Sequence, residues 1–215
     1  MQRALFYLRI FPGTEAEYDR RHAAIWPELA DEIRESGLRN MSGFRRGTDV
    51  WYYQEAEPDR RTAFDVHGPK PHNQRWGRYF RDVIAEITAP DGGLIWHDEV
   101  FHAGGVPLPG PMTRGLFSLV IDPERAADYE HLHAHPWPDL MEAIAATGFR
   151  NYTGFRRGAH VVYYGEFYPD MDTVFGRIAQ TDVNARWGKA FEGIITTITD
   201  AEGKLITADE IFHQE

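Results

Sequence analysis

The sequence repeats itself once, and this repeat constrains the fold more than any other feature of the chain. Residues 3–102 align with residues 114–213 at a constant offset of 111 residues and without a gap, and 45 of the 100 paired positions are identical. Agreement of this length indicates a tandem duplication. We expect a first repeat at residues 1–102, a linker at residues 103–113 that is rich in Gly and Pro, and a second repeat at residues 114–215.

Each repeat predicts the element order β-α-β-β-α-β. In the first repeat, residues 3–11 alternate as a strand does, and Thr14 with Glu17 predicts a capping box at the start of a helix that ends at Gly37. The remaining predicted elements are strands at 38–45 and 50–57, a helical region that begins at 58 and resumes over 73–87, and a strand at 94–102. Such a unit forms a four-stranded antiparallel sheet with both helices on one face. Two bare sheet faces can cover each other, so we expect an α+β fold closed as an eight-stranded barrel or sandwich.

Composition excludes several classes of protein. The formal net charge of −10 over 215 residues argues against a nucleic-acid-binding surface, which needs an excess of Lys and Arg. The absence of cysteine excludes disulfides, thiolate nucleophiles and cysteine metal ligands. No run of about 18 apolar residues occurs, and the start of the chain is typical of a strand, so we expect no membrane segment and a cytoplasmic protein.

One stretch of unusual chemistry occurs in both repeats, as YDRRHAAIWPE from residue 18 and as YEHLHAHPWPD from residue 129. Residues four apart share one face of a helix, so Tyr18, His22 and Trp26 are expected to form one stripe. The corresponding residues of the second repeat are Tyr129, His133 and Trp137. The proline that follows lacks the N–H that a helix needs, so the helix should kink or restart just after the stripe. A polar, aromatic face beside a helix break is typical of a pocket wall.

The paired histidines are the candidate catalytic residues. Imidazole titrates near neutrality and is the commonest general acid or base, so His22 and His133 suit proton transfer. A histidine on a half-buried helix can also be only a hydrogen-bonded structural residue, and its repetition can reflect recent duplication. Trp76 and Trp187, within NQRWG and NARWG, offer a flat platform for a ring-shaped ligand, or else are core residues whose indole N–H donates to a carbonyl.

Two further sets of residues bear on the chemistry of the predicted pockets: one position at which the repeats differ, and a pair of acidic residues that both repeats share. Tyr152 follows Asn151 at the start of a strand where the first repeat has Met41, so the two prospective pockets differ in chemistry at this position. On the last strand of the first repeat, alternation sends either Asp98 or Glu99 inward, so each pocket can own a carboxylate. The same pair recurs in the second repeat as Asp209 and Glu210.

We expect neither a metal nor a cofactor. His131, His133 and His135 invite a metal interpretation, but alternate residues of a helix diverge by about 200°, so the three side chains cannot converge on one ion. No Gly-rich phosphate loop, nucleophilic Ser motif or dinucleotide fingerprint occurs in the chain.

The pattern Tyr18, Arg20-Arg21-His22, Ile25-Trp26-Pro27-Glu28-Leu29, Gly37, Asn40, Arg75-Trp76 resembles the L-rhamnose mutarotase family, and the resemblance covers each repeat nearly end to end. It implies two ferredoxin-like repeats that form an intramolecular dimeric α+β barrel. It also implies an isomerase that interconverts the α and β anomers of L-rhamnose without a cofactor. The proton-donating catalytic histidine of the family would be His22 in the first repeat and His133 in the second. The sugar-contacting residues would be Tyr18, Trp76, Tyr129, Tyr152 and Trp187.

The sequence also departs from the family pattern. The strand tyrosine of the family is Met41 in the first repeat, and the second of two consecutive tryptophans is replaced by Gly77 and Gly188, which enlarges both predicted pockets. Leu132 stands where the motif has an arginine. The second repeat is therefore the better candidate for chemistry on rhamnose.

Three functions remain open from the sequence. The first is a mutarotase-like isomerase that acts on L-rhamnose or a related aldose by histidine general acid/base catalysis. The second is another cofactor-independent isomerase, a cyclase or a monooxygenase for a larger ring substrate. The third is a non-catalytic sugar-binding protein. In each case the partner is a small ring-shaped molecule, and the two repeats form a pseudo-dimer within one chain.

Overall fold

The computed structural model describes all 215 residues as a mixed α+β chain in which every element of the first repeat recurs in the second. The chain forms two compact units: a first unit of Met1–His97 with Asp209–Glu215, and a second unit of Asp98–Ala208. No helix has both the length and the apolar composition that crossing a membrane requires. The α+β class and the twofold repeat are confirmed, whereas the closed barrel, the ferredoxin-like description and the cytoplasmic location stay predictions.

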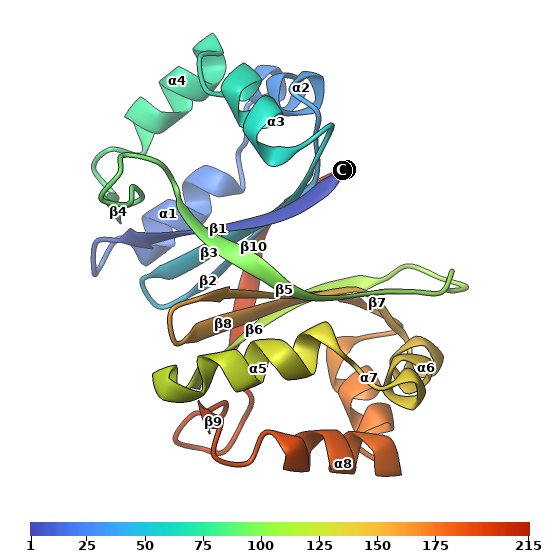
Figure 1. Cartoon of the computed structure of the whole chain (residues 1–215). Coiled ribbons are helices and arrows are strands. Elements are labelled where there is room, and N and C mark those ends of the chain that lie inside the picture. Colours follow the sequence, from blue (N-terminus) through green and yellow to red (C-terminus); the bar gives the residue numbers. More distant parts are fainter. The chain divides into compact units, whose positions relative to one another are not determined.

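The first unit has an antiparallel sheet whose helices lie on one face (Figure 1). Its strands are β1 (Gln2–Ile10), β2 (Leu38–Arg46), β3 (Asp49–Ala56), the short β4 (Ile84–Glu86) and the beginning of β5 (Ile95–Gly105). Its helices are α1 (Glu15–His22), α2 (Pro27–Glu35), α3 (Arg60–His67) and α4 (Pro71–Tyr79). β1 pairs with β3 on one side and with the start of β5 on the other, and β2 pairs with β3.

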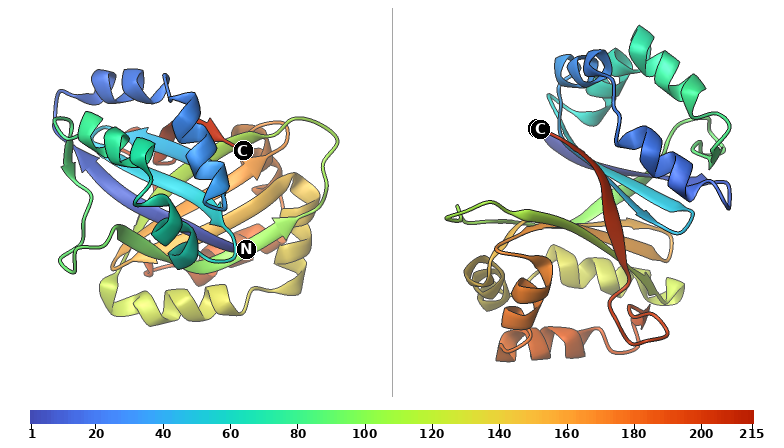
Figure 2. Two further views of the ribbon diagram at one scale, coloured as in Figure 1. Left: turned by 90° about the horizontal axis from the view of Figure 1, so that it is seen from above. Right: turned by 180° about the vertical axis from the view of Figure 1, so that it is seen from behind.

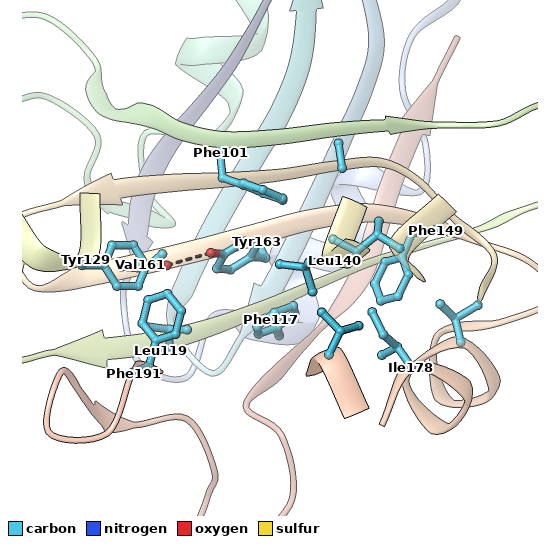
Figure 3. Close-up of a cluster of buried hydrophobic side chains, with 14 of the residues drawn as sticks. Phe101, Phe117, Leu119, Tyr129, Leu140, Phe149, Val161, Tyr163, Ile178 and Phe191 are labelled. Carbon is cyan, nitrogen blue, oxygen red and sulfur yellow. Dashed lines mark hydrogen bonds between the residues drawn. The ribbon is translucent and has the colours of Figure 1, made fainter. Parts of the chain in front are cut away.

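The second unit repeats this arrangement. Its strands are β6 (Thr113–Ile121), β7 (Phe149–Arg157), β8 (His160–Phe167), the short β9 (Ile195–Thr197) and the start of β10 (Thr207–Gln214). Its helices are the short η1 (Pro123–Arg125), α5 (Ala126–Ala134), α6 (Pro138–Thr147), α7 (Met171–Ile178) and α8 (Asp182–Ala190). The core lies between the sheet and the helices, and Figure 3 shows it from Phe101 and Phe117 to Phe149 and Ile178.

The compact units do not coincide with the sequence repeats, because most of the last strand of each repeat belongs to the unit that contains the other repeat. β5 pairs with β1 through Ile95–His97 and then with β7 through 98–105. β10 pairs with β6 at Thr207 and Ala208 and then with β2 through 209–214, so the red C-terminal strand in Figure 2 ends in the first unit. As a result, Phe212 packs in the core of the first unit, and Phe101 packs in that of the second.

The helix break expected near the prolines lies earlier than the sequence predicts. α1 ends at His22, and Trp26 has the extended conformation (φ −73°, ψ 135°) that a following proline favours. Pro27 is then the first residue of α2, where its missing N–H costs no helical hydrogen bond. The restart is confirmed, but the continuous stripe is wrong: Trp26 and its counterpart Trp137 precede the second helix instead of ending the first.

Two other local predictions are also wrong. The Thr14 side chain makes no cap on α1, because its hydroxyl donates to the carbonyl of Phe11 (2.7 Å), while Glu17 pairs with arginines. The helix expected at 73–87 ends at Tyr79, and its counterpart in the second repeat ends at Ala190, while residues 84–86 and 195–197 form the strands β4 and β9. Phe80 and Val83 reach the core from the turn after α4, so the helical period of apolar residues continues beyond the helix itself.

The start of α4 depends on a side chain of another helix. Lys70 occupies the N-cap position and has no acceptor for the free backbone N–H groups. The buried Glu32 of α2 accepts from the backbone N–H of His72 (3.2 Å) and from that of Asn73 (2.9 Å). Burial acts to raise the pKa of Glu32, but a hydrogen bond to His72 Nδ1 (2.8 Å) and these two backbone hydrogen bonds outweigh it and lower the pKa, so the carboxylate is ionised at neutral pH.

The second repeat caps the same helix in another way, which provides a matched test. There Thr181 accepts from the N–H of Asn184 (3.3 Å), and Ala143 stands where the first repeat has Glu32. We expect Glu32→Ala to lower the free energy of unfolding by about 2 kcal/mol, because two N–H groups lose their acceptor. Adding Lys70→Thr, which copies the second repeat, should restore about half of this loss. Urea denaturation at neutral pH measures both changes, and a lack of recovery would contradict the capping role.

Candidate functional site

Each unit buries one histidine that is hydrogen-bonded to a tyrosine of the sheet. In the first unit, His22 at the end of α1 is 6% exposed, and its Nε2 is hydrogen-bonded to the hydroxyl of Tyr52 on β3. The hydroxyl of Tyr18, one helical turn before the histidine, lies 2.9 Å from the Tyr52 hydroxyl. His22 Nδ1 lies 3.1 Å from the backbone oxygen of Tyr18. These contacts form a closed ring of hydrogen bonds.

The second unit has the same ring with close distances. Tyr163 on β8 places its hydroxyl 2.6 Å from His133 Nε2 and 2.7 Å from the hydroxyl of Tyr129, and Figure 3 shows the two hydroxyls facing each other. His133 Nδ1 lies 2.9 Å from the backbone oxygen of Tyr129. Because two repeats with 45 identical positions in 100 retain all three contacts, the arrangement belongs to the fold of the repeat.

The backbone carbonyl sets the direction of this ring. A carbonyl oxygen only accepts, so in neutral His133 the proton is on Nδ1, which donates to the carbonyl of Tyr129. Nε2 then has a lone pair and accepts from the hydroxyl of Tyr163. The Tyr163 oxygen in turn accepts from the Tyr129 hydroxyl. The imidazole is thus held as a base, with a phenol as its proton donor.

Burial keeps both partners of each pair uncharged. It lowers the pKa of His22 and of His133 to about 4, despite the hydrogen bond to the backbone carbonyl, which acts in the opposite direction. Burial also raises the pKa of Tyr52 and of Tyr163 far above neutrality. At neutral pH the resting pair is therefore a neutral imidazole and a neutral phenol.

The low histidine pKa predicts how stability depends on pH. Between the ordinary pKa of about 6.5 and the native pKa of about 4, the unfolded chain binds protons that the native chain does not, so stability is lost as pH falls through this window. At about pH 5, one such histidine should lower the free energy of unfolding by about 2 kcal/mol relative to about pH 7.5. His133→Gln should remove that part of the decrease in urea denaturation. His160→Gln, at an exposed hairpin position, is the control and should leave the decrease unchanged.

A cavity lies beside each ring of hydrogen bonds. In the second unit a cavity of about 310 Å³ has Tyr129, His133, Tyr152, Tyr163 and Trp187 in its wall. A smaller cavity of about 80 Å³ shares His133, Tyr152 and Trp187 with it. Cavities of about 300–1,000 Å³ are typical of small-molecule sites, so the larger one has the size of a ligand site.

The first unit has one larger cavity in the corresponding place. It measures about 530 Å³, and its wall includes Tyr18, His22, Tyr52, Trp76 and Met41. The seven residues expected to form the two sites therefore lie on these cavities, three in the first unit and four in the second. Their roles in catalysis and binding stay predictions.

Each tryptophan ring is nearly perpendicular to the histidine ring of its site. Trp76 lies 5.5 Å from His22 between ring centroids at 89°, and Trp187 lies 5.7 Å from His133 at 82°. Both indoles are half-buried. Trp26 and Trp137 pack against them at 5.0 and 5.2 Å, so each indole is supported by the residue that directly precedes α2 or α6.

The sequence analysis missed the two tyrosines that face the histidines. Tyr52 and Tyr163 are identical between the repeats and alternate with buried aromatic residues on the other sheet face, but alternation alone does not tell which face the helices cover. Gly43 and Gly154 are a further signal. A Cβ on either residue would lie 2.8 Å from Cε1 of the neighbouring tyrosine, so only glycine leaves room for the phenol.

The expected carboxylates are absent from both sites. All four acidic residues of the last strands are exposed, and none lies in the wall of either cavity; they are Asp98, Glu99, Asp209 and Glu210. The prediction that each pocket owns a carboxylate is wrong, because the alternation of these strands is interrupted by a register shift after Glu99 and after Glu210. The polar groups of the sites come from the helices and from β3 and β8.

A sequence model of the family described as L-rhamnose mutarotase matches the chain twice, over residues 3–103 and 114–214. The chain belongs to this family. The L-rhamnose mutarotase of Opitutus terrae is 36% identical over 106 residues, which cover 47% of this chain and 98% of that protein. That of Burkholderia orbicola is 33% identical over 102 residues, which cover 43% of this chain and 86% of that protein. Each relative therefore has about the length of one repeat, and the family is one of isomerase-type enzymes.

Over its whole length, this member of the L-rhamnose mutarotase family is similar in fold to two solved structures. One is a putative monooxygenase of Lactobacillus acidophilus, with a TM-score of 0.61, 11% identity and coverage of 99% of this chain and 96% of that one. The other is a putative monooxygenase of Fusobacterium nucleatum, with a TM-score of 0.57, 10% identity and coverage of 99% and 93%. At such identities the similarity concerns the fold alone.

Proposed function

We propose that the chain interconverts the α and β anomers of L-rhamnose or a related aldose, and that the second unit is the main site. The observation that carries the proposal is the hydrogen bond in which the Tyr163 hydroxyl donates to His133 Nε2. It lies beside a ligand-sized cavity that has an indole in its wall. Membership of the L-rhamnose mutarotase family supports the reaction class. We also infer that the exchanged strands β5 and β10 tie the repeats into the single-chain barrel that the family resemblance implies.

Sugar binding in this cavity would use one apolar wall and a few polar groups. The half-buried indole of Trp187 offers a surface for the apolar face of a pyranose ring. The hydroxyl of Tyr152 makes no hydrogen bond to the protein, and its ring stacks on Tyr163 at 5.1 Å between centroids, so this phenol is available to a ligand close to the histidine pair. The amide of Asn184 also lies in the wall. Such a mixture of aromatic surface and sparse polar groups is typical of small-molecule sites.

The geometry favours base catalysis by the histidine through the tyrosine. The anomeric hydroxyl of the bound sugar would give its proton to the oxygen of Tyr163 as Tyr163 passes its own proton to His133 Nε2. The ring oxygen would take a proton from the hydroxyl of Tyr152, so the bond between the anomeric carbon and the ring oxygen breaks and an aldehyde forms. After the aldehyde rotates, the same groups return the protons as the ring closes on the other face. No net proton is gained or lost.

The resting pKa of His133 fits its role as the acceptor, whereas burial raises the pKa of Tyr152, so this hydroxyl is neutral before the reaction and can give up its proton only as a cation forms nearby. A histidine with a pKa of about 4 is almost fully in its basic form at neutral pH, so it starts the cycle as the acceptor. The cation formed on His133 is costly in a buried site, but the phenolate formed at Tyr152 in the same cavity offsets its charge. This pairing of opposite charges would make the transfers concerted.

Variants of the tyrosines test the proposal. Tyr163→Phe should lower the catalysed rate of anomer exchange on L-rhamnose by about 10²–10⁴-fold, because it removes the proton relay and keeps the ring. Tyr52→Phe is the matched variant of the first unit and should change the rate by less than about twofold if the second unit is the main site. Saturation transfer between the anomeric protons in NMR measures the exchange. Unchanged exchange in the double variant would refute the mechanism, and sugar binding without faster exchange would identify a binding protein.

A further inference from the structure

The cavity of the first unit is larger, and the core around it lacks three aromatic side chains that the second unit has. The second unit holds an aromatic cluster in which Phe149 lies 4.8 Å from Tyr152 and 5.5 Å from Phe167 between ring centroids. The corresponding residues of the first unit are Leu38, Met41 and Ala56. Met41 lies in the wall of one continuous space of about 530 Å³, where the second unit has separate cavities of about 310 and 80 Å³.

A second imidazole lies in the wall of this larger cavity. His67, at the end of α3, is 6% exposed, and its Nδ1 lies 3.5 Å from the hydroxyl of Ser36. Burial lowers the pKa of His67, although the nearby Glu32 and the hydrogen bonds to the Glu32 backbone and the Asn73 side chain act in the opposite direction, so the ring is neutral and has one donor and one acceptor nitrogen. The second unit has Ile178 at this position, so this polar group is particular to the first unit.

The rest of the wall does not suit a monosaccharide. Away from the two histidines, the wall is formed mainly by aliphatic and aromatic side chains, among them Leu8, Leu29, Ile33, Phe64, Ile87 and Phe212, and its only charged groups are the exposed Arg78 and Arg81. Asn73 and Gln74 already donate to the carbonyl of Gly68, and Met41 replaces the phenol that the second unit offers. A sugar would leave several hydroxyls without partners against such a wall, at about 1–3 kcal/mol each.

We propose that the first unit binds a planar, mainly apolar compound of at least two fused rings, with one neutral hydroxyl or carbonyl that hydrogen-bonds to His67. The aromatic wall of Phe6, Phe64 and Trp76 offers faces and edges to such rings. The volume accepts a ligand larger than the one that the second unit accommodates. The duplicated chain then carries two sites of different specificity. This inference does not depend on the proposed mutarotation, because the ligand, the unit and the polar contact all differ.

The experiment titrates the full-length protein with 2-naphthol and with naphthalene by calorimetry. The expected result is one saturable site per chain for 2-naphthol. His67→Ile, which copies the second repeat, should weaken 2-naphthol binding about tenfold and leave naphthalene binding unchanged, because only the naphthol hydroxyl uses the imidazole. Met41→Tyr, which also copies the second repeat, should weaken both compounds at least about tenfold by narrowing the cavity.

Tyr163→Phe is the control, since it lies in the other unit and should leave both affinities unchanged while it lowers anomer exchange. If the chain proves not to catalyse anomer exchange, the binding site proposed for the first unit is unaffected. If that site does not bind 2-naphthol, the proposed anomer exchange is likewise unaffected. Absence of saturable 2-naphthol binding, or equal weakening of both compounds by His67→Ile, would overturn the proposal. If Met41→Tyr does not fold, the two ligands on His67→Ile still decide the question.

Discussion

The hydrogen bond between the imidazole Nδ1 and the backbone oxygen four residues earlier is the contact on which each site depends. It holds the proton on Nδ1 and leaves Nε2 as an acceptor for the phenol of Tyr52 or Tyr163. The contact is local to α1 and α5, so the same short segment that forms the helix also sets the tautomer. Burial lowers the pKa of the imidazole to about 4, so a side chain that would be partly protonated near pH 7 in water stays neutral in the protein at that pH.

The exchange of last strands makes the duplication more than two domains in series. Phe101, from the first repeat, lies 5.5 Å from His133 between ring centroids, and Phe212, from the second repeat, lies 6.2 Å from His22. Each histidine is thus buried in part by a residue of the other repeat, 32 positions away for Phe101 and His133 and 190 positions away for Phe212 and His22. Since burial sets the histidine pKa, neither site has its full environment within a single repeat.

The cores of the two units differ in opposite ways: the second is filled by aromatic rings, and the first contains buried polar groups and a larger cavity. The second unit accumulates aromatic rings around Tyr152, and Gly165 leaves the space that Phe167 occupies, since a Cβ there would lie 2.7 Å from Cζ of Phe167. The first unit instead gains buried polar groups, Glu32 and His67, and keeps an open interior. Packed rings stabilise by contact, whereas an open cavity gives up those contacts in favour of a ligand.

The sequence by itself determined the duplication, the α+β class, and the histidines, tyrosines and tryptophans of α1, α4, α5 and α8, because identity at a constant offset and helical spacing are visible along the chain. However, α1 ends at His22 and α5 at Ala134, which is earlier than Pro27 and Pro138 suggest. The helices α4 and α8 also end before the helical spacing of apolar residues does. Only the tertiary structure decided that Tyr52 and Tyr163 complete the sites, that the acidic residues of β5 and β10 stay outside, and that the last strands are exchanged. These outcomes rest on which sheet face the helices cover and on which strand pairs with which, and both are set by contacts between residues far apart in the chain.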